Sequence, residues 1–275
     1  MTPAPDVSIV VPTRNAIRTV ERCLRSAGSQ AGCVVEVIVV DNHSADGTHE
    51  IAARMADRVV TAGPERSAQR NRGTELARAP WILWIDADMI LPARTAADSV
   101  RAAVGADAIA VFIDEVTEGE GYWTACRSLE RECYRGVVTI ESPRLVRREW
   151  LRAHPFDDRL SGTEDAVLRN AVLRDGRWTR SSSAPIVHDE GRLRLLAVAR
   201  KRYYYGAGLR LYRTLDPGAA SGQIAATLRA YRDNWRLLLA DPVHALGLLV
   251  LRLTEVMAYA AAYLASAPPS NSENT

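Results

Sequence analysis

The sequence predicts an α/β protein in which a doubly wound, mostly parallel sheet is followed by a helical appendage. Four short apolar runs lie within the first 90 residues, and three segments of helical character separate them. The first two runs are rich in β-branched residues and show no polar–apolar alternation, which is typical of strands covered by helices on both faces. Beyond residue 190 three long helical segments follow. We expect a sheet-based domain over residues 1–190, an appendage over 191–267 and a polar, disordered tail over 268–275.

Proline and turn residues delimit the predicted elements. Pro12 ends the first strand, and Ala79-Pro80 ends the helix that precedes the strand beginning at Trp81. The predicted strands are 7–11, 34–40, 58–61, 81–85, 108–116 and 144–148, and the predicted helices of this domain are 19–27, 49–55, 67–78, 93–104 and 121–134. The appendage is predicted as helices 192–215, 223–239 and 243–265, separated by Asp216-Pro217-Gly218 and Asp241-Pro242.

Positive charge is concentrated in the appendage. The formal net charge of the 275-residue chain is only +2, yet residues 191–265 contain eleven Arg and Lys against four acidic residues. Such an excess suits anionic partners, whether phospholipid headgroups, lipid pyrophosphates or nucleic acid. A solvated helix face is the alternative explanation.

The cysteines indicate a reducing compartment. Cys23, Cys33, Cys126 and Cys133 form no CxxC pair and no zinc spacing, and no signal peptide precedes Val7. We therefore expect reduced, structural thiols in a cytoplasmic protein.

Two carboxylates end the apolar run from Trp81. In open α/β sheets ligands bind beyond the carboxyl ends of the strands, where Asp86 and Asp88 would emerge. Clustered carboxylates repel each other unless a hard cation lies beside them. The spacing favours a metal site, with a solvated turn as the alternative.

Five blocks of the sequence together resemble the family-2 glycosyltransferases of the Rossmann-like GT-A fold, over about residues 7 to 190. The blocks are Val-Ser-Ile-Val-Val-Pro-Thr-Arg-Asn (7–15), Val-Ile-Val-Val-Asp-Asn-His-Ser-Ala-Asp-Gly-Thr (37–48), Gln-Arg-Asn-Arg-Gly (69–73), Trp-Ile-Asp-Ala-Asp (84–88) and Phe-Asp-Asp-Arg-Leu-Ser-Gly-Thr-Glu-Asp (156–165). They occur in the order found in the family. The resemblance implies a hexosyltransferase-type enzyme that takes a sugar from a UDP- or GDP-type donor.

The resemblance also implies which residues hold the donor. Its nucleotide-binding positions correspond to Pro12, Thr13, Asn15, Asp41, Arg70, Asn71 and Asp86. Asp41 would accept from the ring N–H of the base, and Asp86 would meet the ribose or the metal shell. Arg66, by contrast, is interpreted as surface charge.

The resemblance further implies the metal ligands and the catalytic acids. Asp86, Asp88 and His188 would hold Mg²⁺ or Mn²⁺ beside the pyrophosphate. Asp165 would act as the base that deprotonates the acceptor hydroxyl in an inverting transfer, and Glu164 would position donor or acceptor. An acidic helix N-terminus is the structural alternative for this pair.

Three rival functions stay open on the sequence. Retaining transfer on the same fold would be distinguished by the anomeric configuration of the product. A sugar-1-phosphate nucleotidyltransferase would carry a glycine-rich loop after its first strand, where this chain has Pro12-Thr13-Arg14-Asn15. A catalytically silent donor-binding relative would not need Asp88, Asp165 and His188.

The appendage suggests where the enzyme works. The segment Arg200-Lys201-Arg202 precedes three tyrosines, 203–205, a composition that suits a membrane interface, with packing on the catalytic domain as the alternative. Helix 243–265 is long enough to span a bilayer, but Arg252 and Glu255 would be costly at its centre. We expect association with the cytoplasmic membrane face or an oligomer, a lipid-linked acceptor, and no nucleic-acid partner. The corresponding pathways are cell-envelope glycan, glycolipid or secondary-metabolite synthesis.

Overall fold

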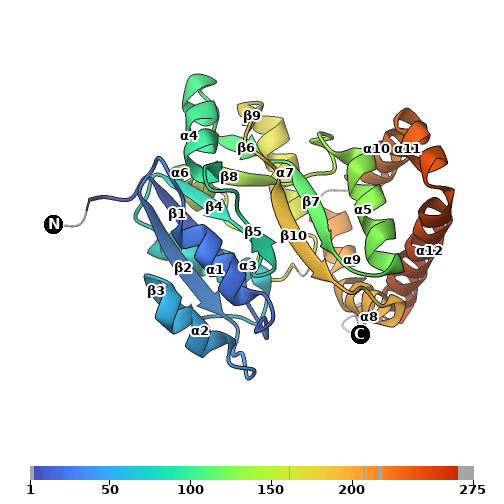
Figure 1. Cartoon of the computed structure of the whole chain (residues 1–275), viewed down its shortest axis with the longest axis horizontal. Helices are drawn as coiled ribbons and strands as arrows, with labels where there is room; N and C mark the ends of the chain where they lie inside the picture. Colours follow the sequence, from blue (N-terminus) through green and yellow to red (C-terminus); the bar gives the residue numbers. More distant parts are fainter. Residues whose placement is uncertain (1–2, 161, 207, 216–218, 266–275) are drawn as a thin grey trace, which may run out of the picture.

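The computed structural model describes residues 3–160, 162–206, 208–215 and 219–265, and its centre is a seven-stranded sheet (Figure 1). The strand order is β3-β2-β1-β4-β8-β6-β9, in which β8 runs antiparallel to its neighbours and the other pairs are parallel. Its strands are β1 (Val7–Thr13), β2 (Val35–Asp41), β3 (Arg58–Thr61), β4 (Trp81–Trp84), β6 (Ala110–Phe112), β8 (Pro143–Arg147) and β9 (Trp178–Arg180). The sequence prediction of a mostly parallel α/β sheet is confirmed.

Helices cover both faces of this sheet. Side chains alternate along β1, so Ile9 and Val11 pack in the first core whereas Val10 packs in the second. The first core is covered by α1 (Val20–Gly28), α2 (Thr48–Met55) and α4 (Thr95–Gly105), and the second by α3 (Arg66–Leu76), α6 (Arg148–Ala153) and α7 (Glu164–Asp175).

The helix α3 lies close to β1 because residue 73 is glycine. A Cβ atom at Gly73 would lie 2.3 Å from Val10 Cγ1, so a larger residue would force the helix away from the strand. Gln69, one turn earlier on α3, donates hydrogen bonds to the Thr13 and Val40 carbonyls at 2.9 Å and 2.6 Å. The close packing thus brings the polar side chains of α3 under the end of β1.

A second, three-stranded sheet lies between the main sheet and the helical end of the molecule (Figure 1). It contains β5 (Met89–Ile90), β10 (Ile186–Gly191) and β7 (Glu115–Gly119), in that order. In the antiparallel pairing of β10 with β5, His188 is opposite Met89. The single strand predicted for 108–116 is therefore wrong. The chain leaves β6 at Phe112 and enters β7 in the other sheet at Glu115.

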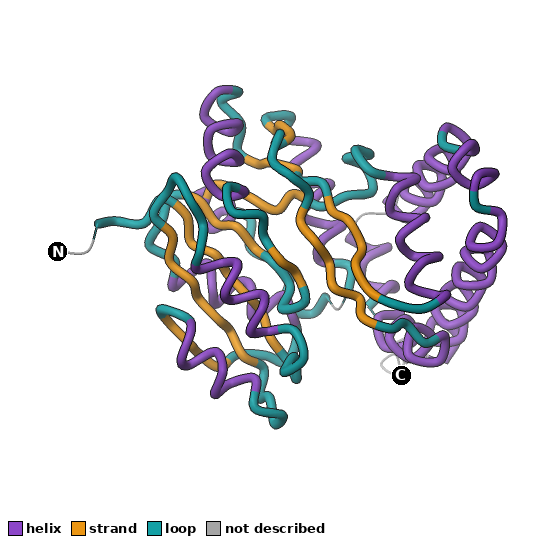
Figure 2. Tube along the Cα trace, in the orientation of Figure 1, coloured by secondary structure: helices purple, strands orange, loops and turns teal. Residues whose placement is uncertain are grey.

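The helical end of the molecule is seen as the purple cluster in Figure 2. Its helices, within the described residues, are α5 (Tyr122–Tyr134), α8 (Leu195–Gly206), α9 (Leu209–Leu215), α10 (Ala219–Asp233), α11 (Trp235–Ala240) and α12 (Pro242–Ala265). The long helices predicted for 192–215 and 223–239 are each divided in two. The helix α5 precedes residue 190 in the chain yet packs directly against α12. The tail predicted for 268–275 lies outside the described residues.

A buried ionic network joins these helices. Glu255 of α12 accepts from Arg127 of α5 at 2.5 Å and from Arg202 of α8 at 2.9 Å. Arg252, one turn earlier on α12, pairs with Glu255 at 2.6 Å and with Glu130 of α5. The charged side of α12 therefore faces protein partners, and these carboxylates and guanidinium groups compensate one another in the interior.

Candidate active site

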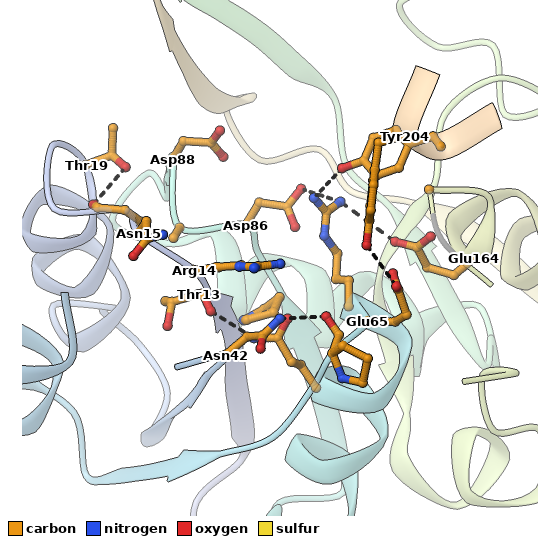
Figure 3. Close-up of a pocket in the computed structure, with 18 of the residues that line it drawn as sticks. Thr13, Arg14, Asn15, Thr19, Asn42, Glu65, Asp86, Asp88, Glu164 and Tyr204 are labelled. Carbon is orange, nitrogen blue, oxygen red and sulfur yellow. Dashed lines mark hydrogen bonds and ion pairs between the residues drawn. The ribbon is translucent and has the colours of Figure 1, made fainter. Parts of the chain in front are cut away.

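A cavity of about 420 Å³ lies at the carboxyl ends of β1 and β4 (Figure 3). The residues that line it come from the loops after β1, β2, β3 and β4, from the start of α3 and α7, and from α8. They are Pro12, Thr13, Arg14, Asn15, Ala16, Arg18, Thr19, Asn42, Pro64, Glu65, Arg66, Gln69, Asp86, Ala87, Asp88, Gly162, Glu164, Tyr204 and Tyr205. Of the sequence-predicted site residues, Pro12, Thr13, Asn15, Asp86, Asp88 and Glu164 line the cavity directly.

Hydrogen bonds fix the loop after β1 against the loop after β2. Thr13 Oγ1 donates to Asp41 Oδ1 at 2.9 Å, and the Ser44 N–H donates to Asp41 Oδ2 at 3.0 Å. Asn15 adopts a left-handed φ of 49°, which asparagine tolerates, and its Oδ1 accepts from the Ala45 N–H at 2.9 Å. Asp41 is thus buried behind the cavity wall, where it orders both loops.

Burial and hydrogen bonding act in opposite directions on Asp41. Burial raises the pKa of this carboxyl group, but the hydrogen bonds from Ser44 and Thr13 outweigh that effect and lower the pKa below its usual value. The group therefore stays ionised at neutral pH.

Two arginines from α3 converge on Asp86. Arg66 Nη1 lies 3.8 Å from Asp86 Oδ2 and 3.7 Å from Glu164 Oε1, and Arg66 Nη2 donates to Tyr205 OH at 3.3 Å. Arg70 Nη2 lies 3.4 Å from Asp86 Oδ1. The interpretation of Arg66 as surface charge is therefore wrong. Helical spacing of four residues places both guanidinium groups on the side of α3 that faces the cavity.

Arg70 is a fully buried cation. Its guanidinium lies 5.7 Å from the ring centroid of Trp84 and 5.6 Å from that of Phe156. Arg70 Nη1 donates to Asp165 Oδ1 at 2.5 Å. A single buried side chain thus bridges Asp165, at the start of α7, to Asp86, after β4.

Asp165 stays charged because of this arginine. Burial raises the pKa of the Asp165 carboxyl group, whereas Arg70 and Arg144 lower it, and the net shift is downward. Its side chain is 30% exposed, so the carboxylate is not sealed off. An ionised carboxylate in this place can accept a proton.

Glu164 has the opposite electrostatic environment. Burial and the neighbouring Asp165 raise the pKa of Glu164 despite Arg70 and Arg66. The side chain is 1% exposed, and neither carboxylate oxygen accepts a hydrogen bond from the residues that the structure describes. Unused buried acceptors at a cavity wall suit the hydroxyl groups of a bound sugar.

The β5–β10 pairing brings His188 to Asp88, although they are far apart in the chain. His188 Nε2 lies 3.3 Å from Asp88 Oδ1, and Nδ1 lies 3.7 Å from Glu115 Oε2. Burial lowers the pKa of His188, but the two carboxylates more than offset it and raise the pKa to about 9. Glu115 also pairs with Arg131 and Arg144.

Once the imidazole of His188 loses its proton, which the charge of a metal ion favours, this donor set fits a divalent cation. Adjacent ligands of an octahedral ion at about 2.1 Å are about 3 Å apart, close to the separation of Asp88 Oδ1 from His188 Nε2. Asp88 Oδ1 is buried and accepts no hydrogen bond of regular geometry from the described part of the chain. No group of three His, Cys, Asp or Glu side chains within that part forms a metal site by itself. A site of one or two carboxylates completed by phosphate and water is typical of Mg²⁺.

Several site residues were not identified from the sequence. Tyr204 OH donates to Glu65 at 2.9 Å and Tyr205 packs over Gly162, so α8 forms one wall of the cavity. Arg202, in the basic triplet, pairs with Glu255 rather than pointing outward. Arg66 and Arg70 are four residues apart on one helix, and this spacing was the sequence signal that both side chains lie at the site. No local sequence pattern indicated that Glu115 lies beside His188.

Asn71, predicted to bind the nucleotide, is not among the residues that line the cavity. Its Nδ2 donates to the Phe156 carbonyl at 2.9 Å and to Asp158 at 2.7 Å, and its Oδ1 accepts from the Phe156 N–H. Asn71 therefore holds the loop that leads to α7.

Comparison with known proteins agrees with this fold. Residues 8–152, just over half of the chain, match the model of glycosyl transferase family 2. The succinoglycan biosynthesis protein ExoO of Rhizobium meliloti (strain 1021) is 39% identical over 89 residues, 30% of this chain and 26% of that protein, so the match spans only about a quarter of its length. The putative glycosyltransferase EpsH of Bacillus subtilis (strain 168) is 26% identical over 254 residues, 84% of this chain and 73% of that protein.

A solved structure extends the likeness to nearly the whole chain. The mannosyltransferase PcManGT from Pyrobaculum calidifontis, solved with GDP-Man and Mn²⁺, superposes with a TM-score of 0.56 at 23% identity, covering 98% of this chain and 78% of that one. This similarity concerns the fold. The chain belongs to glycosyl transferase family 2 and has the GT-A architecture.

Proposed function

We propose that this enzyme is a metal-dependent, inverting glycosyltransferase that moves a sugar from a UDP- or GDP-type donor to an acceptor hydroxyl. The observation that carries the proposal is the convergence of two pairs of acids on one site, Asp86 and Asp88 after β4 and Glu164 and Asp165 at the start of α7. Inverting transfer needs a base on the face of the sugar opposite the diphosphate.

The donor nucleotide is proposed to lie along the loop after β1. Pro12, Thr13 and Asn15 would contact it, while Asp41 would hold the loop or accept from the base. Arg70 and Asn71 would act from behind the cavity wall, Arg70 through Asp86 and Asn71 through the 156–158 loop. This assigns the predicted nucleotide-binding residues to direct and supporting roles.

Asp88 and His188, with Asp86 beside them, are proposed to hold Mg²⁺ or Mn²⁺. When bound, a divalent cation offsets the negative charge that develops on the departing diphosphate. Asp165 would take the proton from the acceptor hydroxyl, and Glu164 would accept hydrogen bonds from sugar hydroxyl groups. Arg70 keeps Asp165 ionised and oriented for this transfer.

The acceptor is proposed to belong to envelope polysaccharide or glycolipid synthesis at the cytoplasmic face of the membrane. The name of the relative ExoO, a succinoglycan biosynthesis protein, supports this class. The cationic surface of the helical end is consistent with a lipid-linked acceptor.

A panel of nucleotide sugars tests the reaction. One UDP- or GDP-sugar should be hydrolysed slowly in the presence of Mn²⁺ and not in EDTA, and an acceptor that supports transfer should give a product of inverted anomeric configuration by NMR. A retained configuration would identify the retaining alternative. Pyrophosphorolysis of the donor would identify a nucleotidyltransferase, and binding without turnover would identify a silent relative.

A further inference from the structure

Exposed apolar side chains are concentrated at the helical end of the molecule. Of the 21 large hydrophobic residues described as exposed, 17 lie between Leu196 and Leu264. Figure 1 places α12 at the outer edge of this end, away from the main sheet. The described surface is therefore strongly asymmetric in its hydrophobicity.

The outer face of α12 is apolar along its whole length. Its large side chains recur at helical spacing and are 44–80% exposed. The face is defined by Val243, Leu246, Val250, Leu253, Met257 and Leu264. Every residue of α12 in the exposed class is Pro, Val, Leu, Met or Ala, so no charge interrupts this face. A helix of 24 residues presents it over roughly 36 Å.

The polar side of the same helix forms ion pairs with neighbouring helices of the protein. Glu255 is 2% exposed and pairs with Arg127 and Arg202, while Arg252 pairs with Glu130. Although α12 is long and apolar enough to cross a bilayer, insertion across one would break these ion pairs in a medium that cannot solvate them. The geometry suits a helix that lies on an apolar surface.

Surface charge distinguishes between two candidate partners of this face, a second copy of the chain and a lipid bilayer. Among the described side chains of residues 191–265, eight cationic groups are exposed against two carboxylates, Asp233 and Asp241, whose side chains are 53% and 45% exposed. The cations include Arg200 on α8 and Arg236 on α11, and both helices pack against α12. A second copy of the chain would bring like charges together, whereas anionic headgroups would complement them.

We propose that the outer face of α12 docks on an anionic lipid bilayer, lying in the interface without crossing it. The docking surface differs from the one expected from the sequence, because Arg202 faces inward and Tyr204 and Tyr205 line the cavity. Apolar burial along α12 supplies the attachment, and the flanking cations make it depend on anionic lipid. The inference extends the proposed membrane location but does not depend on glycosyl transfer.

Vesicle sedimentation of the full chain tests this. The protein should pellet with phosphatidylcholine vesicles that contain phosphatidylglycerol, less with pure phosphatidylcholine, and less as salt is added. The triple variant Leu246→Gln, Leu253→Gln, Met257→Gln should lower the partition coefficient by about tenfold or more, because each substitution removes apolar contact with the interface. The matched control Val34→Gln, Val104→Gln alters exposed apolar residues of the sheet domain and should bind as the unmodified chain does.

Three results would overturn the proposal. The first is that the intact protein stays in the supernatant with anionic vesicles at low salt. The second is that the triple variant pellets as well as the unmodified chain. The third is a concentration-dependent dimer in sedimentation velocity that the triple substitution dissociates without any vesicle binding, which identifies a second copy as the occupant. Metal-dependent donor hydrolysis, measured on the same samples without lipid, reports separately on the proposed reaction.

Discussion

The buried guanidinium of Arg70 and the partly exposed carboxylate of Asp165 form an ion pair with a donor–acceptor distance of 2.5 Å, and the other side of the same guanidinium lies 3.4 Å from Asp86. The side chain of Arg70 thereby contacts both Asp86 and Asp165. This places Arg70 between the residues assigned to the metal and the residue assigned to proton transfer.

Arg70→Met should lower the free energy of unfolding by roughly 3 kcal/mol, because it removes the buried cation that pairs with Asp165 and Asp86 and leaves only Arg66 and Arg144 near these carboxylates. Urea denaturation would measure this loss. Arg72→Met, two residues along on the exposed side of α3, breaks only a surface pair with Glu75 and should change stability by about 0.5 kcal/mol or less. Equal losses in the two variants would show that the Arg70 bridge contributes no special stability.

Asp165→Asn should reduce transfer by about 10²–10⁴-fold, because the amide cannot accept the acceptor proton. Nucleotide affinity should stay nearly constant, since the base acts on the acceptor. Steady-state kinetics and nucleotide titration would separate the two effects. Asp175→Asn, at the far end of α7, is the control and should retain activity. Near-normal transfer by Asp165→Asn would assign the base to another residue.

Nucleotide binding should depend on metal. UDP or GDP at about 100 times its Kd should stabilise the protein by about 2.7 kcal/mol with Mn²⁺ or Mg²⁺ present, and much less in EDTA. Thermal unfolding would record this as a rise in Tm. Asp88→Asn should lose the metal-dependent rise, while Asp98→Asn on α4 should keep it. An equal nucleotide-induced rise in Tm in EDTA would show that nucleotide binding does not require a metal ion.

Glu115→Gln should weaken metal binding by about 10–100-fold, because an outer carboxylate orients a ligating histidine. The Mn²⁺ concentration giving half of the nucleotide-induced Tm rise is the measurement. Glu118→Gln, on the same strand and 51% exposed, is the matched control. An unchanged Mn²⁺ requirement in a folded Glu115→Gln protein would leave Glu115 with a structural role only.

Low pH should destabilise the helical end of the molecule, because it protonates Glu255. Burial raises the pKa of Glu255, but Arg127, Arg202 and Arg252 outweigh it and lower the pKa to about 2. Since this pKa lies below the unfolded value of about 4.5, its stabilisation is complete above pH 4.5 and is lost as the pH falls from 4.5 toward 2. The shift corresponds to roughly 3 kcal/mol. The free energy of unfolding of Glu255→Gln should approach that of the unmodified chain at about pH 3 and fall below it at about pH 6. The same difference at both pH values would contradict this.

The sequence was informative wherever a local pattern determined the structure. The β-branched runs predicted β1 and β2, and the five sequence blocks predicted the family. Glu115 could not be placed in this way, because it reaches His188 through tertiary packing between distant segments, and Tyr205 was expected at the catalytic domain only as one of two alternatives. A single strand was predicted over 108–116, where the structure has two. The apolar pattern of the sequence continues past the point where the chain passes from one sheet to the other.

The two-residue strand β5 has a consequence for how the enzyme can be shortened. The family match ends at residue 152, so that segment contains Asp86 and Asp88 but lacks Asp165, and it lacks β10 with His188. An excised segment of this length would keep β1 to β4 but lose β9 from the main sheet, and it would expose the edge of β5 that β10 covers. A minimal engineered catalyst must therefore continue at least through α8, whose Tyr204 and Tyr205 close the cavity.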